Sequence, residues 1–136
     1  MALVTVEVPA ALVYPLRETL VLLYEATVEA LHFALRASGE RRTPLSEVHD
    51  HRARLAQLDA MLQRLGWPGG SADEAVELSA PEELLHDAVY GALIDAGERL
   101  ATACSRSWSG EAGTEDVRPA AEEVIALDRL LRRLHG

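Results

Sequence analysis

Four ionisable side chains in the first half of the chain have the types and spacing of a metal site. Glu29 and His32 are three residues apart, which places a carboxylate and an imidazole on one face of a helix. Glu47 and His51 are four residues apart on what we predict to be the next helix. In an antiparallel hairpin of these two helices, residue i lies level with about residue 80 − i, so Glu29 lies level with His51. Mixed oxygen and imidazole ligands suit zinc, iron or manganese, and the pattern predicts one such site.

The same four residues have a simpler interpretation. Glu29 and His32 lie on the polar stripe of an otherwise apolar helix, where solvent contact is expected. His51 lies in a row of leucines on one side of its helix. A histidine in such a row is more often hydrogen-bonded to one neighbour, such as Glu47, than bound to a metal. A symmetric di-metal centre is disfavoured, because its ligands would have to recur in both halves of the chain. Glu83-x-x-His86 has the right spacing, but in an up-and-down bundle it lies at the opposite end from Glu29.

Four amphipathic segments are expected to carry these side chains as helices. In these segments apolar residues recur at intervals of three and four, most regularly in the second segment, and so form an apolar seam along one side of each helix. Capping or helix-stopping residues mark the ends of the segments. The third segment opens with a capping-box pattern, and a stretch rich in glycine and serine (105–116) precedes the fourth. The expected helices are 15–36, a second from the Thr43-Pro44 cap to Gly66, a third opening with Ser79-Ala80-Pro81-Glu82, and 117–134.

The first of these helices is apolar around most of its circumference. Its polar residues form one narrow stripe, namely Glu18, Glu25, Glu29, His32 and Arg36. Such a helix must be covered on more than one side, by the rest of its own fold or by a second subunit. Thr27 is polar within the apolar seam, and we expect its hydroxyl to bond to the carbonyl of Leu23 if it is buried. The third helix has a seam rich in alanine, which would let a neighbouring helix approach closely.

Two short segments, 4–8 and 75–78, have the alternation of strands, although two strands alone are marginal unless they pack on something. The chain also resembles itself at a shift of 69 residues. The shared pattern L-D-x-[ML]-L-x-R-L places Asp59 on Asp128 and Arg64 on Arg133. We therefore predict an all-α, antiparallel four-helix up-and-down bundle made of two duplicated αα-hairpins, at about 9–66 and 79–135.

Length and composition limit the class of protein. The 136 residues fit one domain, 1–136, and with 49% apolar but only 4% aromatic residues its core must be aliphatic. A net charge of −9 disfavours nucleic acid as a partner. The single cysteine, Cys104, excludes an internal disulfide and suits a reducing cytosol, so a cytoplasmic location is expected. The chain shows neither a basic leader nor an apolar run of membrane-spanning length.

No grouping of nucleophile, base and acid stands out, and the pattern names no cofactor. Trp67 and Trp108 follow helix ends, where we expect them to plug the bundle. We predict a non-catalytic helical bundle that acts in self-assembly or protein–protein interaction, as a homodimer to which the first helix contributes. The alternative is a metal-binding bundle that uses the site of Glu29, His32, Glu47 and His51. Whether the chain is an enzyme stays open.

Overall fold

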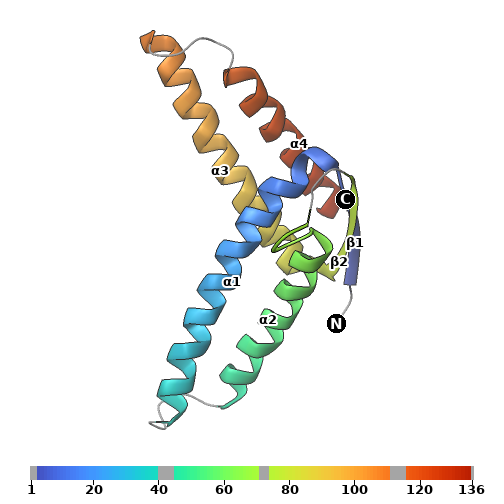
Figure 1. Ribbon diagram of the computed structural model, residues 1–136, viewed down its shortest axis with the longest axis vertical. Coiled ribbons are helices and arrows are strands. Elements are labelled where there is room, and N and C mark those ends of the chain that lie inside the picture. The colour runs from blue at the N-terminus through green and yellow to red at the C-terminus, as the bar shows by residue number, and fades with distance from the viewer. Residues whose placement is uncertain (1–2, 40–44, 71–73, 111–115, 136) are drawn as a thin grey trace.

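The computed structural model describes residues 3–39, 45–70, 74–110 and 116–135, and within them it has four helices and a two-stranded sheet (Figure 1). The predicted all-α class with four helices is confirmed. The same order, strand then helix then helix, occurs twice along the chain. The elements are β1 (Leu3–Val8), α1 (Ala10–Gly39), α2 (Leu45–Arg64), β2 (Val76–Pro81), α3 (Glu82–Ser109) and α4 (Val117–His135).

The two strands form an antiparallel pair in which Val6 lies opposite Leu78 and Val8 opposite Val76. Their alternation turns one face of the pair toward the helices. The buried residues of this face are Val6, Val8, Leu78 and Ala80. Both predicted strands are therefore present, and they bury their apolar side chains in the same core as the helices. This packing supplies the stability that an isolated pair of strands would lack.

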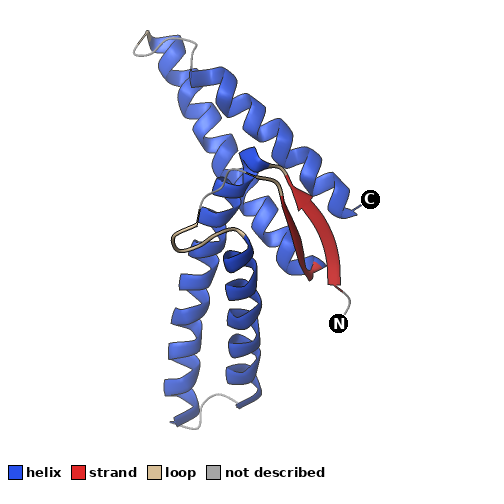
Figure 2. Cartoon of the chain, turned by 45° about the vertical axis from the view of Figure 1, so that its right-hand side comes forward, coloured by secondary structure: helices blue, strands red, loops and turns tan. Residues whose placement is uncertain are grey.

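The helices form two antiparallel hairpins, α1 with α2 and α3 with α4, which extend in opposite directions from the sheet (Figures 1 and 2). The hairpins meet where the first half of α1 crosses the first half of α3. There a Cβ atom added to Gly91 would lie only 3.0 Å from Cγ2 of Thr19. Ala88 and Ala92 are also buried on this part of α3. The small side chains of α3 thus allow the close approach that the sequence indicates.

One aliphatic core lies at this crossing. Its fully buried large side chains are Val8, Leu12, Val13, Leu16, Leu20, Leu58, Leu62, Leu65, Leu78, Leu85, Leu127 and Leu130. Outside the crossing each hairpin is an arm only two helices thick. The outer part of the α1–α2 arm buries Thr27, Ala34 and Val48, and in the described part of the other arm no residue between Ala96 and Leu127 is buried. The arms therefore contribute little to the core.

Two helix ends differ from the sequence-based expectation. α1 begins at Ala10, five residues before the expected start at Pro15, so this proline lies inside the helix. Leu12 and Val13 are almost completely buried in the added turn, and their burial outweighs the backbone hydrogen bond that proline cannot donate. α3 continues into the glycine- and serine-rich stretch 105–116 and ends at Ser109. Its C-cap Gly110 has a φ of 80° and donates its N–H to the last turn.

The capping box predicted at the start of α3 is wrong. The residue before the helix is Pro81, and no side chain caps the helix there. Ser79 instead belongs to β2, where its hydroxyl lies 2.7 Å from the hydroxyl of Thr5 across the strand pair. The Thr43-Pro44 cap predicted for α2 lies outside the described residues.

The shared core predicts a strong difference between two leucines of α2. Replacing the fully buried Leu58 with alanine should lower the free energy of unfolding by about 2–5 kcal/mol, because it opens a cavity in the shared aliphatic core. Leu45→Ala, at a residue that is 65% exposed, should change it by less than about 0.5 kcal/mol. Urea unfolding followed by circular dichroism measures both. Equal effects would contradict the placement of the core.

Candidate functional site

The structure brings together one of the two predicted metal-ligand pairs. Nε2 of His51 lies 3.9 Å from Oε1 of Glu47, one turn earlier on α2. Glu29 and His32 are exposed on α1, and the ring of His32 contacts Phe33 edge-on at 6.1 Å. Among the described residues, no group of three or more histidine, cysteine, aspartate or glutamate side chains is arranged to hold a metal ion. Metal binding by these four residues stays a prediction.

From Leu22 to its end, α1 exposes large apolar side chains. All five residues of the polar stripe are exposed, as expected for a solvated row. Leu22 and Phe33, which are 66% and 67% exposed, lie along one side of this stripe. Val28 and Leu35, which are 43% and 52% exposed, lie along the other. We call these four residues the α1 apolar rows.

Thr27, on the opposite side of α1, is buried. Its hydroxyl donates a hydrogen bond of 2.7 Å to the carbonyl oxygen of Leu23, which confirms the predicted bond. α1 therefore packs on α2 through one side, while the α1 apolar rows face away from that contact.

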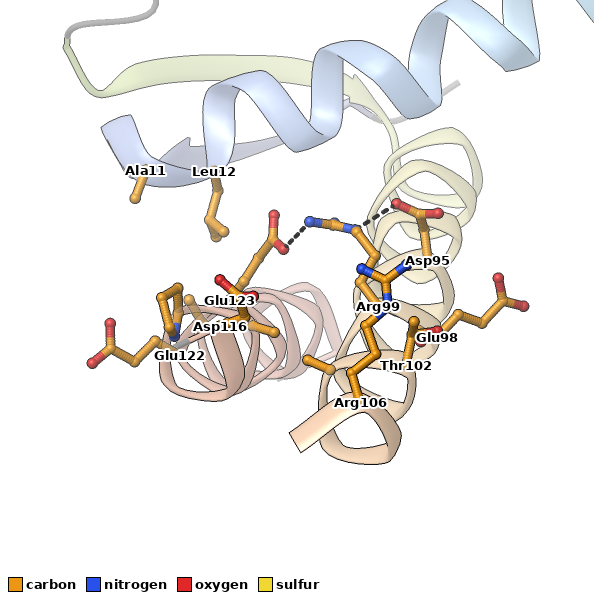
Figure 3. Close-up of a pocket in the computed structure, with 14 residues that line it drawn as sticks. Ala11, Leu12, Asp95, Glu98, Arg99, Thr102, Arg106, Asp116, Glu122 and Glu123 are labelled. Atoms are coloured by element: carbon orange, nitrogen blue, oxygen red, sulfur yellow. Dashed lines mark hydrogen bonds and ion pairs between the residues drawn. The ribbon is translucent and has the colours of Figure 1, made fainter. Parts of the chain in front are cut away.

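A groove of about 930 Å³ lies between the start of α1, the outer half of α3 and the start of α4 (Figure 3). Arg99 of α3 spans it, with a guanidinium nitrogen 2.7 Å from Glu123 of α4 and another 3.1 Å from Asp95. Burial alone would lower the pKa of Arg99, but the hydrogen bonds and charges of Glu123 and Asp95 outweigh it and raise this pKa. The guanidinium thus stays charged and ties α3 to α4. No motif in the sequence indicates this ion pair.

The chemistry of the groove is that of a structural ion pair. Its ionisable lining residues are five carboxylates and two guanidinium groups, namely Asp95, Glu98, Asp116, Glu122, Glu123, Arg99 and Arg106. The excess of carboxylates disfavours an anionic ligand. The hydroxyl of Thr102 donates to the backbone oxygen of Glu98, and the described lining includes no histidine that could activate it. The groove therefore offers no nucleophile with a base.

A second cluster joins the start of α3 to the end of α4. Nδ1 of His86 lies 2.7 Å from Nε2 of His135, and Nδ1 of His135 lies 3.5 Å from Oε1 of Glu82. The ring of Tyr90 stacks on His86 with a centroid separation of 5.6 Å. The sequence motif that includes His86 pairs it with Glu83, and His135 belongs to no motif. The contact could have been predicted from the sequence by assuming that α3 and α4 are antiparallel, because that arrangement places these histidines side by side.

The two tryptophans have different environments. Trp67 packs against the core and lies 5.9 Å from the ring of Tyr24, so its predicted role as a plug is confirmed. The same prediction for Trp108 is wrong, because that side chain is 94% exposed. The reason is that α3 continues to Ser109, which places Trp108 on the outside of a helical turn instead of past the helix end.

Comparisons with protein families, curated proteins and solved structures find no match to this chain. None of the described helices is both long and apolar enough to cross a membrane. A function for the chain must accordingly be inferred from its residues and their arrangement.

The Arg99–Glu123 ion pair can be tested by a double-mutant cycle with Arg99→Ala and Glu123→Ala. Because Arg99 is half exposed while Glu123 is largely buried, we expect a coupling energy of about 1 kcal/mol in urea unfolding. The Arg118–Glu122 pair within α4 is the matched control, since both side chains are exposed and the expected coupling is about 0.3 kcal/mol. Equal couplings would show that the groove pair does not hold α3 to α4.

Proposed function

We propose that this chain is a non-catalytic assembly protein that forms a homodimer through the outer half of α1. The observation that carries the proposal is the exposure of the α1 apolar rows on an arm only two helices thick. Several large apolar side chains exposed on one helix, here in two rows beside a polar stripe, are typical of interaction sites in soluble proteins.

The total exposed area of the chain supports the proposal that a partner covers part of its surface. The chain exposes 8666 Å². A compact monomer of its mass, 14.8 kDa, exposes roughly 7,000 Å². The excess of about 1,700 Å² is enough for an interface of standard size, which buries about 800 Å² on each partner. The two arms, which extend in opposite directions, leave more surface exposed than a compact bundle of the same helices would (Figure 1).

A second copy of the chain fits the α1–α2 arm better than a different protein whose surface carries charges of a single sign. Two such arms packed together give a four-helix arrangement in which each α1 is covered on a second side. A twofold contact uses the same patch on both copies, so its charges must complement themselves. The polar stripe between the α1 apolar rows includes the acidic residues Glu25 and Glu29 and the basic residue Arg36, and thus meets this requirement.

The poverty of catalytic groupings also supports an assembly role. The groove of Figure 3 holds the Arg99–Glu123 ion pair with an excess of carboxylates, and no activated nucleophile lies among its described lining residues. The α1 apolar rows have no acid–base chemistry at all. The single cysteine, Cys104, is exposed and free, which suits the reducing cytosol in which we expect the protein to act.

The proposal predicts that Phe33→Glu together with Leu35→Glu converts a dimer into a monomer. Two carboxylates would enter the apolar rows on both sides of the stripe, where their desolvation opposes association. Sedimentation equilibrium of the wild-type chain and the variant at micromolar concentration measures the mass. The matched control is Ile125→Glu, at a residue of α4 that is 51% exposed on the other arm and should leave the dimer intact.

Two outcomes would contradict the proposal. A wild-type chain that sediments as a monomer leaves the α1 apolar rows without a second copy to cover them. A dimer that survives Phe33→Glu with Leu35→Glu, but dissociates with Ile125→Glu, would place the interface on the α3–α4 arm. Circular dichroism of each variant confirms that it has kept its helices.

A further inference from the structure

We propose that His86 and His135 form a binding site for a divalent transition metal such as Zn²⁺. The metal would be bound through Nδ1 of His86 and Nε2 of His135. This site is distinct from the predicted set on α1 and α2, and it does not depend on the homodimer.

The orientation of the two rings supports the proposal. The nitrogens that face each other, 2.7 Å apart, come from different helices. The rings are steeply inclined, at 67°, with their centroids 4.9 Å apart. Two nitrogens bound at 2.0–2.1 Å to a tetrahedral zinc lie about 3.3 Å apart. These two nitrogens therefore need to move apart by only about 0.6 Å to bind one zinc ion. His135, which would move, is half exposed in the last turn of α4.

Glu82 occupies the place of a supporting carboxylate. Its Oε1 lies 3.5 Å from Nδ1 of His135, the ring nitrogen that does not face His86. Histidines that bind metals commonly donate this second N–H to a carboxylate, which fixes the tautomer and makes the other nitrogen a better ligand. Glu82 would thus position His135 without binding the metal itself. The ring of Tyr90, stacked on His86 at an angle of 9°, holds the other ligand.

The electrostatic surroundings favour a cation. The site lies at the end of α4, which is the negative end of that helix dipole, and Glu82 places a carboxylate 3.5 Å from His135, which offsets the positive end of α3. The nearby Arg132 is paired with Asp128 at 3.0 Å, which reduces its repulsion. The site supplies two protein ligands, fewer than the three or more of a closed metal group, so the remaining positions are open to water or to a ligand.

Isothermal titration calorimetry of the full chain with Zn²⁺ tests the site. We expect one saturable site per chain, lost in His86→Gln and in His135→Gln. Glu82→Gln should weaken binding by roughly 10–100-fold. The matched control is Glu83→Gln, which removes the adjacent carboxylate and should leave the affinity unchanged, because Glu83 has no hydrogen bond or ion pair with either histidine.

A second control separates this site from the predicted one. His32→Gln with His51→Gln should leave zinc binding intact. Loss of binding in that variant, with retention in His86→Gln, would overturn the proposal in favour of the α1–α2 site. Absence of saturable zinc binding to the wild-type chain would also contradict the proposal, and the contact between the two histidines would then be a hydrogen bond only. Cu²⁺ bound to the wild-type chain should show two imidazole nitrogens in its electron paramagnetic resonance spectrum, and one nitrogen would also contradict the proposal.

Discussion

The close approach of α1 to α3 at Thr19 and Gly91 governs how the rest of the chain can be arranged. A side chain larger than hydrogen at residue 91 would press on the threonine methyl group, so the two helices cross nearly in contact. Leu20 and Val89 are fully buried near this crossing. Each hairpin then adds its second helix on the outside, and the strand pair closes the side of the crossing (Figure 2). Because the crossing uses only the first halves of α1 and α3, the outer halves are left as two-helix arms.

The relation between the two halves supports the proposed duplication. At a shift of 70 residues Glu7 corresponds to Glu77, and these two residues lie opposite each other in the strand pair. At a shift of 69, Leu20 corresponds to Val89 at the crossing. Further corresponding residues are buried in both halves, namely Leu16 with Leu85, Thr27 with Ala96, Leu58 with Leu127, and Leu65 with Leu134. Two hairpins related in this way would cross about a twofold axis. The exposed chemistry is not shared, since the histidine pair belongs to α3 and α4 alone.

Local patterns were sufficient to predict the elements of the fold. The seams and stop signals identified four helices, the alternation near Val6 and Val76 identified both strands, and Thr27 bonds as expected. The open arrangement of the arms could not be predicted, because it depends on one crossing between residues 72 positions apart. The start of α1 was misplaced for a related reason. Tertiary burial of Leu12 and Val13 outweighs the usual position of proline, which no local rule contains.

The candidate sites show the same limit of sequence-based reasoning. The exposed rows of α1 follow from helical periodicity alone, so the surface in the proposed function was predictable. The Arg99–Glu123 and His86–His135 contacts require the register of α3 against α4. Between these two contacts the α3 residue changes by 13 and the α4 residue by 12, as an antiparallel pair requires. An antiparallel register assumed for the second hairpin, as it was for the first, would have predicted both contacts.

The central claim is that a second copy covers the outer half of α1, and an intermolecular distance tests it most directly. One spin label per chain, placed by Ala53→Cys at an exposed residue of α2 with Cys104→Ser to remove the exposed native thiol, reports only on contacts between copies. Double electron–electron resonance should then give one defined distance, which disappears when Phe33→Glu is added. A signal with no dipolar coupling above that of independent chains at the same concentration would contradict the account.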